Sequence, residues 1–157
     1  MSTLEVKAIQ APTGYDLQMP AGHILQTVQG TYGTRVVSSS DTLADTGLTA
    51  SITPSSTSSK ILVTISQMGM DKRTNNAYMR IVTFRDSTQI HVATNQHMYT
   101  ANTDGATSSC TWSYLDSPSS TSALTYKTQF SSTVNNAQVS VQWSQAESTI
   151  ILQEVAG

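Results

Sequence analysis

Apolar and polar residues alternate along most of this 157-residue chain, and no other feature constrains its fold as strongly. Residues 48–52 and 110–114 show the pattern clearly, with an apolar side chain at every second position. Successive side chains of a β-strand point to opposite faces, so a two-residue period is typical of a half-buried strand. The helical spacing of three to four residues is nearly absent. The sequence therefore predicts an all-β chain.

About ten short strands are predicted, separated by turn residues such as Pro54 and the Asn135-Asn136 pair. No helical segment long enough to connect parallel strands lies between them, which excludes a parallel α/β sheet. No repeat of fixed length is present, which excludes a propeller or a solenoid. The remaining fold class is an antiparallel β-sandwich or jelly roll. The expected strands are residues 24–29, 35–38, 48–52, 61–66, 78–84, 88–94, 110–114, 124–130, 139–143 and 149–155.

Two breaks that contain Pro and Gly, at residues 11–14 and 19–22, separate the start of the chain from the β region. We therefore expect a short N-terminal docking arm (residues 1–22) and a β jelly-roll domain (residues 23–157), a length that suits one domain. Apolar side chains in the arm argue against a fully solvated tail. We expect the arm to dock on the rest of a larger particle through Leu4, Val6 and Ile9.

Charge is scarce in this chain, since only 11% of its residues are charged and its net charge is −2. Typical soluble proteins carry about 25% charged residues. Nucleic acids and anionic membranes bind basic surfaces, so neither is expected as a partner. The longest apolar runs are about four residues, far below the roughly 20 of a membrane span. The N-terminus also lacks the basic and apolar regions of a signal peptide.

Several predicted strands are apolar on both faces, among them residues 61–66, 78–84 and 149–155. In an antiparallel sandwich one face of a sheet packs in the core and the other normally meets water. Strands with two apolar faces therefore indicate a second buried surface, and contact between subunits is its usual source. The low charge agrees, because a subunit that hides part of its surface needs fewer charges.

Residues that could carry catalysis or bind a metal form no recognisable pattern in the sequence. His91 and His97 lack the spacing of zinc ligands, and the carboxylates lie mostly in predicted turns, where Asp closes the turn. The chain has neither a Gly-x-Ser-x-Gly nucleophile motif nor a phosphate-binding loop. Cys110 is expected to be a buried strand thiol, and residues 71–73 a solvated turn. We therefore expect no enzyme, no cofactor and no metal.

Six segments of the chain carry a family resemblance. They are residues 45–54 (DTGLTASITP), 56–63 (STSSKILV), 124–130 (LTYKTQF), 148–155 (STIILQEV), 2–9 (STLEVKAI) and 19–26 (MPAGHILQ). Together they resemble the C-terminal domains of bacteriophage tail-fibre and virion structural proteins, common in marine phages and cyanophages. Residues 66–122 match least. The resemblance implies a jelly roll like that of tumour necrosis factor and complement globular heads, which is a homotrimer.

The resemblance also implies a non-enzymatic protein of the virion surface, assembled in the host cytoplasm. Phage fibres usually carry a long shaft before this domain, whereas the predicted domain here follows only the short arm. We therefore expect a short tail fibre or tail appendage that binds the host surface, including its polysaccharide. Two alternatives stay open: a capsid decoration protein at local three-fold positions, and a small glycan hydrolase with a facing pair of carboxylates. The expected partners are two further copies of the chain and other virion proteins of the tail, baseplate or capsid.

The expected interfaces can be assigned to residues. The trimer interface is expected at Tyr126, Phe130 and Trp143. The irregular segment 95–108 and the loop at 116–122 are expected at the exposed end, because loops on a rigid scaffold tend to carry recognition. The recognition residues expected there are Tyr99, Asn102, Asp104 and Asp116.

Overall fold

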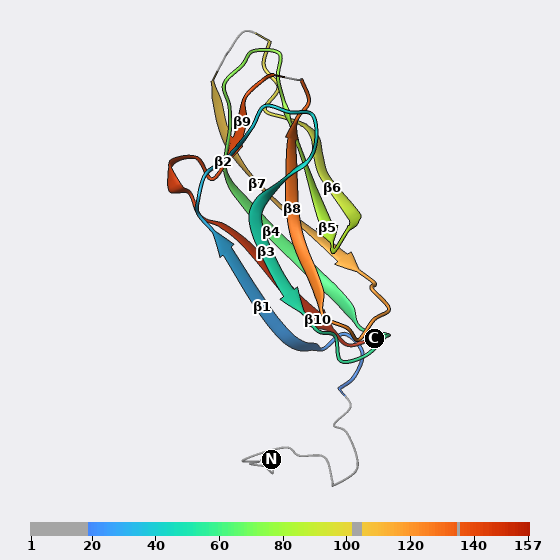
Figure 1. The fold of residues 1–157 in the computed structure, drawn as a ribbon. Coiled ribbons are helices and arrows are strands. Elements are labelled where there is room, and N and C mark those ends of the chain that lie inside the picture. Colours follow the sequence, from blue (N-terminus) through green and yellow to red (C-terminus); the bar gives the residue numbers. More distant parts are fainter. Residues whose placement is uncertain (1–18, 102–104, 135) are drawn as a thin grey trace.

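The computed structural model describes residues 19–101, 105–134 and 136–157. Within these ranges the chain forms ten β-strands in two antiparallel sheets, which confirms the predicted all-β class (Figure 1). A single 3-10 turn, η1 (Trp143–Gln145), precedes the last strand. The strands are β1 (Ile24–Tyr32), β2 (Val36–Ser38), β3 (Ala44–Ile52), β4 (Lys60–Lys72), β5 (Met79–Arg85), β6 (Thr88–His97), β7 (Ala106–Asp116), β8 (Leu124–Ser132), β9 (Val139–Val141) and β10 (Ser148–Val155).

The strand order is that of a jelly roll. In sheet A, β1 pairs with β10, β10 with β4, and β4 with β7; in sheet B the order is β3-β8-β5-β6. The chain passes repeatedly from one sheet to the other, as the two Greek keys of a jelly roll require. The short strands β9 and β2 extend sheet A, because β9 pairs with Asp71 and Lys72 at the end of β4.

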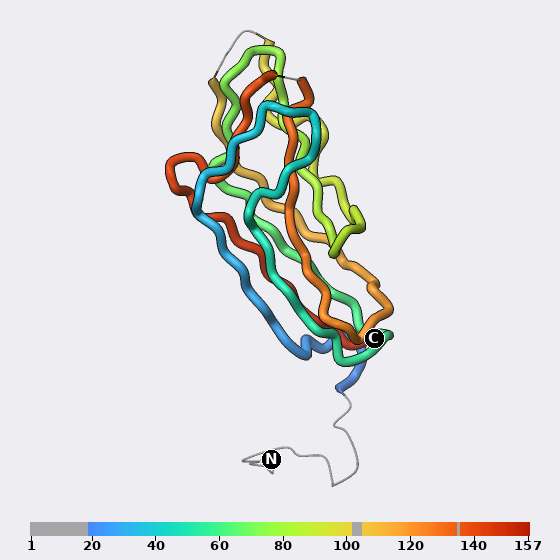
Figure 2. The backbone as a smooth tube through the Cα atoms, in the orientation of Figure 1, coloured from blue at the N-terminus to red at the C-terminus, as the bar shows by residue number. Residues whose placement is uncertain are grey.

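Both ends of the β domain lie at the same end of the sandwich (Figure 2). The amide of Gly22 donates a hydrogen bond of 2.8 Å to the carbonyl of Ala156, and the amide of Ala156 donates one of 2.8 Å to the carbonyl of His23. The predicted arm before residue 19 lies outside the described residues.

The core between the sheets consists of two apolar clusters, built by the inward-facing half of each alternating strand. The cluster nearer the chain ends comprises Leu48, Ala50, Ile52, Ile61, Val63, Ile65, Leu124, Tyr126, Ile150 and Leu152. The second comprises Met70, Met79, Ile81, Phe130, Val139 and Val141. Trp112 packs against both, and its indole nitrogen donates a hydrogen bond of 3.0 Å to the Thr83 hydroxyl.

A buried row of polar side chains joins the two sheets between these clusters. We call it the polar bridge, and it comprises Thr46, Thr128, Gln67 and Ser148. The Thr46 and Thr128 hydroxyls lie 2.5 Å apart, and Thr128 donates to Oε1 of Gln67 at 3.1 Å. Nε2 of Gln67 then donates to the Ser148 hydroxyl at 2.9 Å. Buried polar groups are costly unless they are paired, and this chain of hydrogen bonds pairs them across the sandwich.

Candidate functional site: a tryptophan loop with two arginines

A buried carboxylate marks the outer side of sheet A where β4 ends. Asp71 is 0% exposed, and its Oδ2 accepts a hydrogen bond of 2.8 Å from Nε of Arg73. Its Oδ1 accepts one of 3.0 Å from the Thr107 hydroxyl on β7. The predicted solvated turn is therefore wrong for Asp71 and Lys72, which are both fully buried. The reason is that β4 continues to Lys72, with β7 along one edge and β9 along the other.

Two guanidinium groups contact one indole above this carboxylate. Cζ of Arg35 lies 4.2 Å from the centroid of the Trp143 ring, and Cζ of Arg73 lies 4.3 Å from it. Such contacts are stabilised by attraction between a cation and the aromatic ring. Arg35 is held further by the hydroxyl of Ser140, which accepts a 3.1 Å hydrogen bond from its Nε. We call Arg35, Arg73 and Trp143 the arginine–tryptophan cluster.

The backbone that carries Trp143 is strained. Gln142, Ser144 and Gln145 have φ angles of 54°, 58° and 60°, in the left-handed region that non-glycine residues rarely adopt. Each such residue costs on the order of 1–3 kcal/mol, and strain of this kind concentrates at functional sites. Gly69, with φ 57°, lies under the loop, where a Cβ atom would come within 2.6 Å of the Trp143 amide nitrogen. Three strained positions in a row of four make this loop a candidate site.

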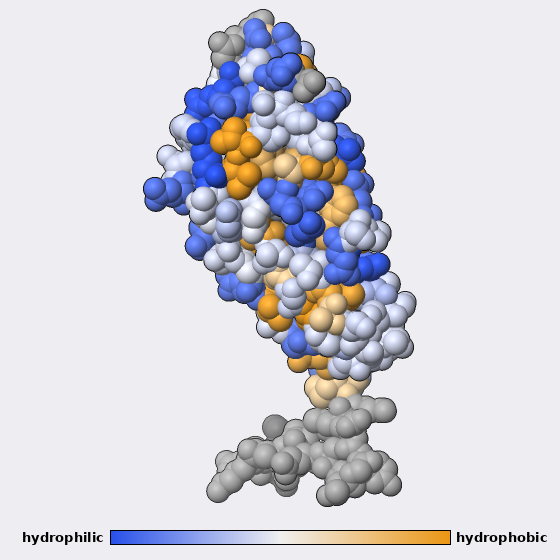
Figure 3. Space-filling view, in the orientation of Figure 1, coloured by the Kyte–Doolittle hydropathy of each residue, from blue (hydrophilic) through white to orange (hydrophobic). Residues whose placement is uncertain are grey.

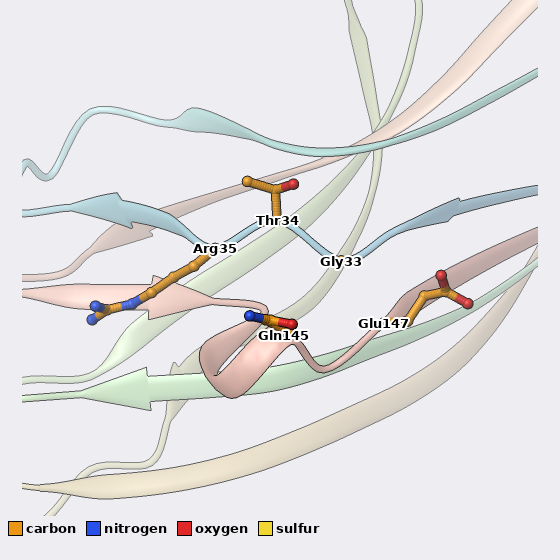
Figure 4. Close-up of a pocket in the computed structure, with 5 residues that line it drawn as sticks. All are labelled: Gly33, Thr34, Arg35, Gln145 and Glu147. Atoms are coloured by element: carbon orange, nitrogen blue, oxygen red, sulfur yellow. The ribbon is translucent and has the colours of Figure 1, made fainter.

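An open cavity of about 540 Å³ lies beside the loop, lined by Gly33, Thr34, Arg35, Gln145 and Glu147. Figure 4 shows that residues 33–35 form one side and that Gln145 and Glu147 come from the opposite segment. The side chains of Arg35 and Glu147 lie at opposite ends of this group (Figure 4). The cavity therefore offers a cation, a carboxylate and neutral hydrogen-bonding groups.

Two other buried carboxylates have structural partners within the chain. Oδ2 of Asp116 accepts hydrogen bonds from Nη1 of Arg85 at 2.6 Å and from the hydroxyl of Tyr126 at 2.7 Å. Burial, together with Asp116, raises the pKa of Tyr126 far above its usual value. For Glu154, burial acts to raise the pKa, but hydrogen bonds from Ser55 and Gln26 outweigh it and lower the pKa to about 2.

The residues predicted for the trimer interface and the recognition loops differ in their exposure in the structure. Tyr126 and Phe130 are both 0% exposed inside the sandwich, so their side chains offer no surface to a second subunit. Trp143 is half-buried and lies in η1 rather than in the predicted strand. Asp116 is the buried last residue of β7 and not an exposed loop residue. Tyr99 is 54% exposed and packs edge-on against Tyr78, with 5.7 Å between the ring centroids.

Five residues with predicted roles lie outside the described residues: Leu4, Val6, Ile9, Asn102 and Asp104. Sequence reasoning missed the arginine–tryptophan cluster. Its members are far apart in the chain, and no local motif joins residues 35, 73 and 143.

The outer face of sheet A is a second candidate surface. In the middle of this face, twelve residues in three rows point outward from β1, β10, β4 and β7, and every one is uncharged; the first charged residue along β4 is Lys60, in the adjoining row opposite Val155. We call this surface the neutral face; it comprises Thr27, Gln29, Thr31, Thr149, Ile151, Gln153, Leu62, Thr64, Ser66, Thr111, Ser113 and Leu115. The outer face of sheet B differs, because it carries Arg80, Lys127 and Asp45.

The surface seen in Figure 3 has no single large hydrophobic area; its hydrophobic residues form small patches separated by hydrophilic ones. Among the described residues, no three His, Cys, Asp or Glu side chains gather closely enough to hold a metal ion. Within the same ranges, no helix has the length and apolar character needed to cross a membrane.

No protein-family model and no curated protein sequence matches this chain. Solved structures match it in fold. VP2 of the infectious bursal disease virus subviral particle aligns with a TM-score of 0.50 and 8% identity over 97% of this chain and 42% of that chain. A mutant VP2 of the same virus, solved as T=1 particles, aligns with a TM-score of 0.49 and 11% identity over 96% of this chain and 41% of that chain. This chain thus spans about two fifths of the length of these two VP2 chains. The likeness to VP2 of the subviral particle shows a shared β-sandwich fold.

Proposed function

We propose that this chain is a non-enzymatic structural protein of a bacteriophage virion, a homotrimeric short tail fibre or tail appendage that binds the host surface. The observation that carries the proposal is the jelly-roll strand order, β1-β10-β4-β7 against β3-β8-β5-β6, in a fold shared with VP2 of a subviral particle. The resemblance of six sequence segments to phage fibre and virion proteins supports the phage assignment.

The neutral face supports assembly from copies of the same chain. A sheet face that meets water normally carries charged residues, because about 25% of the residues of a typical soluble protein are charged and most of these are exposed. Twelve uncharged side chains in three rows can approach another copy without like-charge repulsion and without desolvating an ion. We therefore assign the neutral face to contact with the other two copies. Of the residues predicted for the trimer interface, only Trp143 retains an accessible surface.

A capsid decoration protein is the second candidate function. The solved structure that shares the fold is itself the protein of a subviral particle, so a place on a shell is supported as well. Capsids offer local three-fold positions that a trimer fits. The hydrolase alternative gains no support, because Asp71, Asp116 and Glu154 each accept hydrogen bonds from this chain's own side chains.

Antibodies against the purified protein test the proposal. In electron micrographs of phage particles from the source culture, label at the tail is the expected result. Label over the head instead would contradict the tail appendage and favour the capsid decoration protein. Particles that carry no label, in a culture whose lysate contains the protein, would overturn the virion role altogether.

A further inference from the structure

We propose that the arginine–tryptophan cluster and the cavity beside it bind a carboxylated saccharide. This inference deepens the proposed attachment role and rests on it, since it names the chemical class of the host surface group. The cluster supplies the cations that meet the carboxylate. The cavity supplies hydrogen-bonding groups for the sugar hydroxyls.

The charges of the cluster do not cancel. Arg35 and Arg73 share the single carboxylate of Asp71, at 4.0 Å and 2.8 Å, which leaves one positive charge in excess. Their side chains are 34% and 40% exposed, whereas that of Asp71 is 1% exposed. The excess charge is therefore presented to solvent while the compensating carboxylate stays beneath it.

The donors of both arginines are already oriented. Each Nε atom has a hydrogen-bond acceptor, Ser140 for Arg35 and Asp71 for Arg73. In the part of the chain that the structure describes, their terminal nitrogens donate no hydrogen bond. A guanidinium group presents these nitrogens as a planar fork that matches the two oxygens of a carboxylate. Because the Trp143 ring holds both groups, a ligand loses little side-chain entropy in using them.

The strained loop supports a binding role for the same place. Gln142, Ser144 and Gln145 adopt unfavourable backbone angles, and their combined effect is to seat Trp143 against the two arginines. A loop with only a connecting role could avoid this cost through glycine at those positions. The buried Oε1 of Gln142 also has no hydrogen-bond partner among the described residues, which is a further cost at the base of the loop.

The lining of the cavity indicates which kind of anion fits. Thr34, Gln145 and Glu147 offer the donors and acceptors that sugar hydroxyls need, and about 540 Å³ lies in the range of small-ligand sites. Glu147 repels a densely charged polyanion such as a nucleic acid or a heavily sulfated glycan. A uronic acid, with one carboxylate among several hydroxyls, matches Arg35 at one end of the cavity and Glu147 at the other (Figure 4).

Isothermal titration of the full 157-residue protein with an aldotriouronic acid, a trisaccharide that carries a single glucuronate, tests the inference. The aldotriouronic acid should bind, more tightly at low than at physiological ionic strength, because screening weakens the charge contact. Maltotriose, a neutral trisaccharide, should not bind. Arg35→Gln and Arg73→Gln should each weaken binding by about tenfold or more. Lys127→Gln removes a cation on sheet B and is the matched control, with binding expected to stay at the wild-type level.

The opposite results are equally definite. Absence of binding of the aldotriouronic acid, equal binding of maltotriose, or wild-type affinity in both arginine variants would overturn the inference. Tighter binding of a sulfated trisaccharide would overturn the carboxylate assignment. Arg35→Gln leaves Asp71 its closer partner Arg73, so this variant should keep its thermal midpoint. Antibody label at phage tails, together with no binding of the aldotriouronic acid to the purified trimer, would refute this inference and leave the proposed function standing.

Discussion

The hydroxyl of Thr128 on β8 donates a hydrogen bond of 3.1 Å to Oε1 of Gln67 on β4, and this contact joins the two sheets through the core. Both side chains are 0% exposed. The polar bridge to which they belong separates two apolar clusters. A slip of either strand by one residue would turn its bridge residue outward, so the bridge helps to fix the register of the sandwich.

Replacing Thr128 by Val should therefore destabilise the fold. The substitution keeps the shape of the side chain but leaves the buried Oε1 of Gln67 without its donor, at a cost of about 1–3 kcal/mol. Chemical denaturation should show this loss in the free energy of unfolding. Thr88→Val, at an exposed position of β6 outside the neutral face, is the matched control and should change stability by less than about 0.5 kcal/mol. Equal stability of the two variants would contradict the role of the bridge.

Gly47 should tolerate no side chain. Its φ angle is 87°, and the ring of Tyr32 occupies the place of a Cβ atom. Gly47→Ala should lower the free energy of unfolding by about 1–3 kcal/mol through backbone strain and displacement of the ring. Gly33→Ala serves as control, because the nearest atom to its Cβ would be 3.8 Å away. A wild-type melting midpoint for Gly47→Ala would show that this contact is not made.

Acid should weaken the fold through Glu154. Burial acts against its ionisation, but hydrogen bonds outweigh burial and lower its pKa from 4.5 to about 2, so it binds a proton more readily in the unfolded chain. Its stabilising contribution is complete above pH 4.5 and is lost as the pH falls through about 2. Unfolding free energies measured across this range should fall less steeply in Glu154→Gln than in wild type. The Glu154→Gln variant should keep a residual slope because of Asp45. Burial acts to raise the pKa of Asp45, but the hydrogen bonds that Gln129 and Lys127 donate to it outweigh burial and lower the pKa.

A charge on the neutral face should separate the subunits. Thr64 lies in the middle row of this face, and Thr64→Lys would bring like charges together or bury an ion between copies. The variant should remain folded, and light scattering should give the mass of a single chain. Ser51→Lys places the same charge on the outer face of sheet B and should leave the assembly intact. An intact assembly in Thr64→Lys and single chains in Ser51→Lys would instead assign the subunit interface to the outer face of sheet B.

The sequence predicts the architecture well because the two-residue period is a local signal. Each of the ten expected strands overlaps a strand of the structure, although β4 and β7 are longer than expected. Alternation shows which residues share a face but not what covers that face. Tyr126 and Phe130 were therefore predicted at an interface, whereas sheet A covers them within the same chain.

The candidate site was beyond local reasoning for two physical reasons. Charged residues normally mark turns, so Asp71 and Lys72 gave no sign that β4 continues through them with partners on both edges. Trp143 continues the alternation of the preceding strand, but left-handed backbone at Gln142 ends that strand and turns the ring toward Arg35 and Arg73. Contacts between residues 35, 73 and 143 depend on the complete sandwich.

The solution mass of the purified 157-residue protein tests the central claim most directly. One chain has a mass of 16.8 kDa. Light scattering behind a sizing column should give three times this chain mass, with no dependence on dilution over a wide range. Such a result is expected of a homotrimer that packs through its neutral faces. The mass of a single chain at all concentrations would contradict the homotrimer and leave the neutral face to a partner other than this chain.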